Sequence, residues 1–202
     1  MSQALEFVFS FRSPYSWFAS TQIMAKLPAD VEVNWRPFFP LPEFPNFAPV
    51  QGRWDYNIRD VMRLAKFFGL PLKWHAPEDP DWSIPHAAFV RASELGASRD
   101  FVLAIYEARY LRGEDVSLPE VIDAAAKTAC LDGAEVVAAS QDAGLQGQLR
   151  AQVKSDFDER GIFGVPTLIL PRGTRYWGHD RIDWALREGF LDEAIAAASS
   201  AA

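Results

Sequence analysis

The chain of 202 residues has a single cysteine, Cys130, and therefore cannot form a disulfide within itself. This cysteine usage favours a reducing, cytoplasmic location. The sequence also lacks the run of about 18 apolar residues that a membrane-spanning helix requires. Glu6 interrupts the first apolar stretch, so the start does not resemble a secretory signal. We expect no membrane partner.

An excess of basic residues is also missing, since the formal net charge is −7. General nucleic-acid binders need a basic surface, so we expect no nucleic-acid partner. His75, His86 and His179 are scattered and show no metal-ligand spacing. We interpret each histidine as structural or solvated and expect no metal site. We interpret Cys130, in "AAAKTACL", as a small core residue.

The pattern along the chain predicts an α/β fold with the order β-α-β, a run of helices, and then β-β-α. Leu5–Phe11 and Val31–Phe38 read as strands around a helix that starts near Ser13. The segment from Pro37 to Pro49 contains five prolines and four phenylalanines, which predicts an ordered loop.

Helical segments follow as far as Gly161, and β-type sequence returns at "VPTLILP" and "TRYWG" before a final helix from Asp180. We therefore predict one α/β domain made of residues 1–38 and 161–202. Residues 39–160 form a loop and an inserted all-helical domain.

Ser13 and Ser16 lie where a dithiol enzyme would carry Cys-x-x-Cys, directly at a helix start. Ser13 before Pro14 is a common helix cap, and local sequence alone favours that role. The same position can also bind an anion, because the helix dipole, free N–H groups and a hydroxyl converge there. A thiol brought by a ligand would lose its proton more easily at this point. No Gly-x-Ser-x-Gly motif surrounds Ser13, so a serine hydrolase is disfavoured.

Two further motifs carry polar chemistry. Val165-Pro166 precedes a strand. The proline could simply mark the start of the strand, or the peptide bond could be cis, with flanking backbone groups that pair with an extended peptide. Asp180-Arg181 opens the last helix, either as a cap with a solvated neighbour or as a clamp for a group bearing an amine and a carboxylate. The local sequence leaves both choices open.

A third polar stretch holds Arg53, Tyr56, Asp60 and Arg63 on one helix face, which reads first as a solvated face with an Asp60–Arg63 pair. Trp54 and Trp177 stand beside these motifs and are candidates to line a pocket, as are Tyr15, Ser16 and Tyr56.

Taken together, "SPYSWFA", "RWDYNIRDVMRLAKFFGLP" and "GIFGVPTLIL…YWGHDR" resemble the 2-hydroxychromene-2-carboxylate isomerase and kappa-class glutathione transferase family. This family is a branch of the DsbA-like thioredoxin fold. The resemblance covers most of the chain and implies a thioredoxin-like domain with a helical insertion, usually as a homodimer. Arg53 stands where the family commonly has lysine, and Ser10 where it often has Asp.

The resemblance implies glutathione as cofactor or co-substrate, with its thiolate held by Ser13. Val165, beside a cis-Pro166, would pair with the glutathione backbone. Asp180 and Arg181 would hold the γ-glutamyl end, and Arg53 and Asn46 are further candidates for glutathione contacts.

Three functions are compatible with these residues. The first is a glutathione-dependent isomerase acting on an aromatic or conjugated electrophile, in aromatic compound catabolism. The second is a kappa-class-like glutathione transferase. The third, of another class, is a non-catalytic thioredoxin-like module that binds peptides. A dithiol oxidoreductase is disfavoured because neither Ser13 nor Ser16 can form a disulfide.

Overall fold

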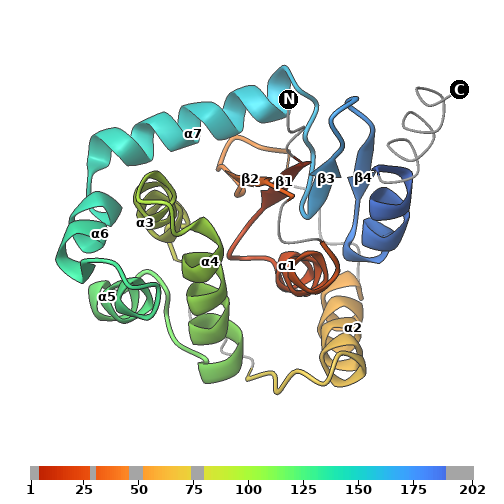
Figure 1. Ribbon diagram of the computed structural model, residues 1–202, viewed down its shortest axis with the longest axis horizontal. Coiled ribbons are helices and arrows are strands. Elements are labelled where there is room, and N and C mark those ends of the chain that lie inside the picture. Colours follow the sequence, from red (N-terminus) through yellow and green to blue (C-terminus); the bar gives the residue numbers. More distant parts are fainter. Residues whose placement is uncertain (1–4, 28–30, 46–51, 74–79, 190–202) are drawn as a thin grey trace, which may run out of the picture. The chain divides into compact units, whose positions relative to one another are not determined.

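A computed structural model describes residues 5–27, 31–45, 52–73 and 80–189. The chain divides into two compact units (Figure 1). Unit 1 combines Met1–Phe38 with Phe163–Ala202, and unit 2 comprises Phe39–Ile162. The ends of the chain therefore build one unit, and the middle of the chain builds the other.

Unit 1 contains a four-stranded mixed sheet in the order β2-β1-β3-β4. Strand β1 is parallel to β2 and antiparallel to β3, and β3 is antiparallel to β4. The elements are β1 (Leu5–Phe9), α1 (Pro14–Lys26), β2 (Val33–Pro37), β3 (Thr167–Ile169), β4 (Arg175–Trp177) and the 3-10 turn η2 (His179–Arg181), followed by helix over 182–189. The predicted α/β class and its β-α-β … β-β-α order are confirmed.

The core of unit 1 is aromatic and centres on β1. Phe7, Phe9 and Phe11 are fully buried. The ring of Trp35 on β2 meets the rings of Phe7 and Phe9 edge-on, at centroid distances of 5.1 and 5.7 Å. Because burial of one phenylalanine ring contributes about 1.5–3 kcal/mol, this cluster fixes β1 as the central strand.

Unit 2 is helical. Its elements are α2 (Arg53–Phe67), α3 (Ser83–Glu94), α4 (Ser98–Tyr106), the π-helical turn η1 (Glu107–Arg112), α5 (Pro119–Thr128), α6 (Gly133–Ser140) and α7 (Ala143–Asp158). Helix α3 packs against α4, α6 and α7, and α5 packs against α4 and α6. Val61 and Ala65 are the buried residues of α2, whereas α3 is buried along most of its length.

Two local predictions need correction. Cys130 is exposed rather than part of the core, and its φ of 59° ends α5 in the left-handed conformation. Within the predicted run of helical segments, the helix that begins as α4 does not continue as a regular α-helix, because residues Glu107–Arg112 form the π-helical turn η1. Hydrophobic periodicity does not distinguish these two helix types here, because the π-helical turn is a short stretch within an otherwise α-helical segment.

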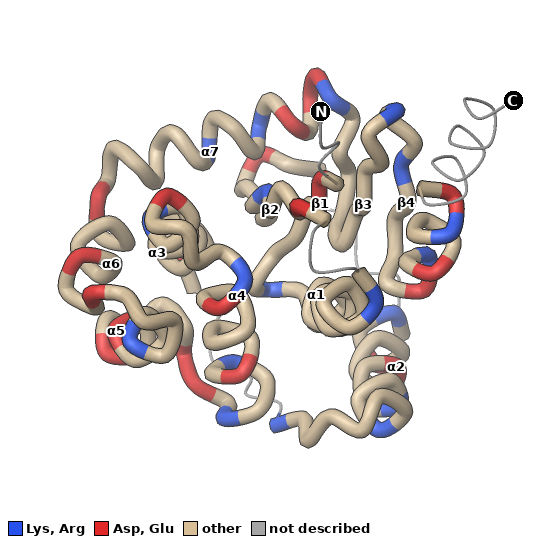
Figure 2. Tube along the Cα trace, in the orientation of Figure 1, with Lys and Arg blue, Asp and Glu red and all other residues tan. Residues whose placement is uncertain are grey.

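Charged residues of both signs are interspersed over both units, and no large single-sign block stands out among the residues drawn (Figure 2). Over the described ranges, no helix combines the length and the apolar character needed to cross a bilayer.

Candidate active site

Ser13 caps α1. Its backbone is extended (φ −94°, ψ 114°), and its Oγ accepts a hydrogen bond from the Ser16 N–H at 3.2 Å. Pro14 follows at the first helical position, and the first turn carries no acidic side chain. The hydroxyl hydrogen of Ser13 can still be donated, because the capping bond uses only an oxygen lone pair. A donor at the positive end of a 13-residue helix favours an anion there.

Ser16 points into the protein and has a structural role. It is fully buried, and its Oγ accepts a hydrogen bond from the Ser10 N–H at 3.3 Å. Ser10 is also buried, and its Oγ accepts from the Arg12 N–H at 3.2 Å. These bonds shape the loop between β1 and α1. Of the two serines, only Ser13 is thus half exposed at this helix start.

Val165 and Pro166 lie at the same edge of the sheet as this loop. Val8 lies opposite Thr167 in the antiparallel register, so the end of β1 meets the start of β3. The Val165–Pro166 peptide bond is cis, as the resemblance implied. Val165 stands before β3, and its backbone N–H and C=O form no hydrogen bond to another described residue. These two groups are available to an extended ligand.

Strands β3 and β4 bring the third motif to the same edge. The Gly178 N–H donates to the Pro166 carbonyl at 2.9 Å. The indole of Trp177 covers Gly164, where an added Cβ would lie 2.8 Å from the indole Nε1. Trp177 is still 56% exposed. Glycine at position 164 is thus required for the close approach of this ring.

Asp180 and Arg181 are paired with each other, through an ion pair of 3.1 Å between Arg181 Nη1 and the Asp180 carboxylate. The Arg181 guanidinium also lies over the Trp184 ring at 4.8 Å. Both charged side chains are about half exposed. A pre-formed pair of opposite charges on one turn offers an anchor for a carboxylate and an amine of the same ligand.

His179, interpreted from the sequence as structural or solvated, makes structural contacts within unit 1. Its ring stacks on Tyr15, with centroids 5.5 Å apart and planes 13° apart. The edge of Phe18 lies 6.0 Å from the same ring, and Gln22 Nε2 donates to the His179 carbonyl at 3.2 Å. These contacts hold η2 against the first turns of α1.

The helix after η2 is fixed at two further points within unit 1. Lys26 at the end of α1 pairs with Asp183 at 2.5 Å. Tyr176 on β4 donates to Glu188, and this hydrogen bond raises the pKa of Tyr176 above its usual value. Unit 1 therefore brings together Ser13, Tyr15, Val165, Pro166, Trp177, Asp180 and Arg181.

The remaining candidates lie elsewhere. Arg53, Trp54 and Tyr56 occupy the exposed first turns of α2 in unit 2. The expected Asp60–Arg63 pair forms at 3.1 Å, and its guanidinium lies over the Tyr56 ring. Asn46 lies outside the described residues. In the part of the chain that the structure describes, no cluster of His, Cys, Asp or Glu could hold a metal ion.

The sheet order, the helix that follows β1 and the helical unit inserted after β2 define a thioredoxin-like protein with a helical insertion. The sequence profile of the DSBA-like thioredoxin domain matches residues 4–188, and the chain belongs to that family.

Among known proteins, the chain is 25% identical over 195 residues to the 2-hydroxychromene-2-carboxylate isomerase of Sphingobium xenophagum, covering 91% of this chain and 96% of that protein. A solved 2-hydroxychromene-2-carboxylate isomerase shares the fold with a TM-score of 0.77 at 20% identity, over 98% of this chain and 99% of that one.

The cytosolic disulfide reductase DsbM from Pseudomonas aeruginosa, solved with GSH, has a TM-score of 0.69 at 18% identity, over 96% of this chain and 99% of that one. The relatives thus include an isomerase and a disulfide reductase, and they support an isomerase-type DsbA-like fold.

Proposed function

We propose that this chain is a glutathione-dependent isomerase that acts on an aromatic or conjugated small molecule. The observation that carries the proposal is the Ser13 hydroxyl, which caps a helix start with no acidic side chain in its first turn. A thiol bound there would have its pKa lowered by the helix dipole and by the hydroxyl donor. The protein would supply the environment, and glutathione would supply the sulfur.

The chemistry follows from a thiolate held at Ser13. The thiol proton leaves to solvent, and the sulfur lone pair forms a bond to an electrophilic carbon of the conjugated substrate. The displaced π electrons move to the conjugated carbonyl oxygen, so the former double bond becomes single and can rotate. When the electrons return, the carbon–sulfur bond breaks and glutathione leaves unchanged. The protein contributes mainly by orienting two small molecules.

The rest of the ligand has candidate partners in unit 1. The unengaged backbone of Val165 would pair with the glutathione peptide, and the Asp180–Arg181 pair would take its γ-glutamyl end. The exposed ring of Trp177 would line the substrate side. A homodimer and a cytoplasmic location are part of the same proposal, and light scattering at several protein concentrations tests the dimer.

Two other functions use the same site. A kappa-class-like transferase would release the adduct, so mass spectrometry of the products separates it from an isomerase. A peptide-binding module is favoured by the unengaged Val165 backbone, but it has no use for the charge pair at Asp180 and Arg181.

Calorimetric titration of glutathione, in two buffers of different ionisation enthalpy, tests the proposal. We expect proton release on binding to the wild type, and none in Ser13→Ala. Ser13→Thr, which keeps the hydroxyl and the cap, should retain it. Arg181→Ala should weaken binding about tenfold or more, whereas the control Arg187→Ala, an exposed arginine of the following helix, should not.

Absence of binding at millimolar glutathione would overturn the proposal. Binding of extended peptides under the same conditions would then favour the peptide-binding module.

A further inference from the structure

Arg109 is an unusual arginine of the helical unit, and it is independent of the function proposed above. Four described arginines of unit 2 are half-buried, and three of them form ion pairs. These pairs are Arg91 with Glu94 and Glu135, Arg150 with Asp81, and Arg160 with Asp156. Arg109 is equally half-buried, but no carboxylate of the described residues pairs with it. A half-buried charge without a counterion is uncommon, because burial weakens its hydration.

Two aromatic rings hold the Arg109 guanidinium in place. Its Cζ lies 4.5 Å from the centroid of the Trp82 ring and 5.4 Å from that of Tyr110. Both rings are almost completely buried, at 4% exposure each. Contacts of this kind stabilise a cation and restrict its position without neutralising its charge.

The nitrogens of Arg109 are not all equivalent. Nε is buried and has no hydrogen-bond partner. The two terminal nitrogens are not among the buried unpartnered atoms, and no described residue bonds to them, so they reach solvent. The outer edge of the fork is therefore accessible to a ligand, while its position is fixed by the rings.

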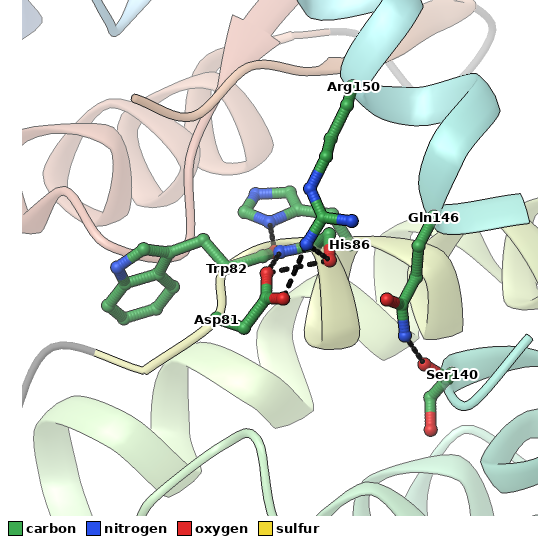
Figure 3. Close-up of polar contacts among 7 residues, drawn as sticks. Asp81, Trp82, His86, Ser140, Gln146 and Arg150 are labelled. Carbon is green, nitrogen blue, oxygen red and sulfur yellow. Dashed lines mark hydrogen bonds and ion pairs between the residues drawn. The ribbon is translucent and has the colours of Figure 1, made fainter. Parts of the chain in front are cut away.

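The position of Trp82 is itself fixed by a polar network at the start of α3 (Figure 3). The Trp82 carbonyl accepts a hydrogen bond of 2.6 Å from His86 Nδ1. Asp81 accepts from the Ser83 N–H at 2.9 Å and pairs with Arg150 of α7. In Figure 3 the Trp82 ring points away from this Asp81–Arg150 pair. The network thus fixes the backbone at Trp82, while the Trp82 indole contacts the Arg109 guanidinium.

Arg109 belongs to the π-helical turn η1, and π-helical turns occur frequently at functional sites. The backbone N–H of Lys73 donates to the Tyr110 carbonyl at 2.7 Å, so the main chain at Lys73 lies next to this turn. Lys73 is exposed, and no acidic residue of the described chain pairs with it. Arg109 has no carboxylate partner among the described residues, so its positive charge creates a local attraction for an anion in a chain of net charge −7.

We propose that Arg109 is a binding site for the carboxylate of a small organic acid. The planar guanidinium edge matches a carboxylate, which can accept two parallel N–H···O bonds. The ligand contacts the edge of the Arg109 guanidinium and not its face, because the rings of Trp82 and Tyr110 cover the face. The carboxylate can come from an aromatic acid or from glutathione, and the experiment below distinguishes these sources.

The side-chain N–H resonance of Arg109 in ¹H–¹⁵N spectra of the full-length wild type is the readout. Benzoate, acetate, S-methylglutathione and chloride are added separately at equal ionic strength. We expect a saturable shift with benzoate and none with chloride. Arg109→Gln should weaken benzoate binding about tenfold or more. Arg109→Lys, which keeps the charge but not the fork, should also weaken it. The exposed Arg99→Gln serves as the matched control and should bind normally.

A shift with S-methylglutathione alone would support the site and assign glutathione as its source of carboxylate. No shift with any carboxylate would overturn the proposal and leave Arg109 as a structural stacking residue. The wild-type titration does not depend on the folding of any variant. Because calorimetry with Ser13→Ala probes the thiol separately, failure at Arg109 and failure of the glutathione proposal are distinguishable.

Discussion

His86 makes the stability of the helical unit depend on pH. The imidazole is fully buried and stacks on Phe39 at a centroid distance of 5.0 Å. Since the Trp82 carbonyl can only accept, Nδ1 carries the hydrogen of their 2.6 Å bond. Burial disfavours the charged form and outweighs this hydrogen bond, so the pKa of His86 falls from 6.5 to about 4.

The sign of the effect follows from this depressed pKa. Below the unfolded pKa of 6.5, the unfolded chain binds a proton that the folded chain refuses, so stability falls with falling pH down to about 4. One pKa unit corresponds to 1.36 kcal/mol, so the full loss is about 3 kcal/mol, of which about 2 kcal/mol is lost by pH 5. Burial raises the pKa of Asp81, but the Ser83 and Arg150 contacts outweigh burial and lower it from 3.8. Its contribution is therefore fully present between pH 7 and pH 5 and is lost only at lower pH.

The assay compares urea unfolding of the wild type and His86→Asn from pH 7 to pH 5. The asparagine amide can replace the Nδ1 donor but does not titrate. We expect the variant to be less stable at pH 7, because the ring stack is lost, and to lose about 2 kcal/mol less on acidification. A parallel pH dependence of both proteins would refute the reasoning, as would an NMR titration in which the His86 ring protonates above pH 6.

Three further predictions concern single residues. Gly164→Ala should destabilise unit 1 by about 1–3 kcal/mol and increase the accessibility of Trp177, since the new Cβ would lie 2.8 Å from the indole nitrogen; fluorescence quenching checks this. Cys130→Gly should stabilise the protein by up to about 1 kcal/mol, because glycine adopts the φ of 59° without the strain of a Cβ; thermal unfolding measures it. Asp81→Ala should cost about 1 kcal/mol through loss of the bond to the first N–H of α3, whereas Arg150→Ala should cost less, because the ion pair is over 40% exposed on both sides.

The opposite results would be informative. If Gly164→Ala left the quenching of Trp177 fluorescence unchanged, the close approach of Gly164 would not constrain the Trp177 ring. If Gly at position 130 destabilised the protein, the thiol would make a contact worth more than the backbone strain. The Asp81 substitution removes the same ion pair, so a larger cost at Arg150 would show that its hydrogen bond to Ser83 Oγ holds the start of α3.

The sequence alone determined the architecture of this protein. Aromatic strand patterns at both ends and helical periodicity between them are local signals, and they are enough for the α/β class and the order of elements. Ser13 as a helix cap was also readable, because capping depends on a residue and its nearest neighbours. The prolines after Pro37 predicted an irregular loop for the same local reason, and residues 38–45 form no helix or strand.

Only the tertiary structure decided which side chains are buried in packing and which stay exposed. Ser13 and Ser16 look equivalent in sequence, yet Ser16 is fully buried against the Ser10 N–H, while Ser13 is half exposed. Likewise, the stack of His179 on Tyr15 and the clamping of Arg109 by Trp82 join residues far apart in the chain. Such contacts depend on how strands and helices pack, and hydrophobic periodicity carries no information about the partner that packing selects.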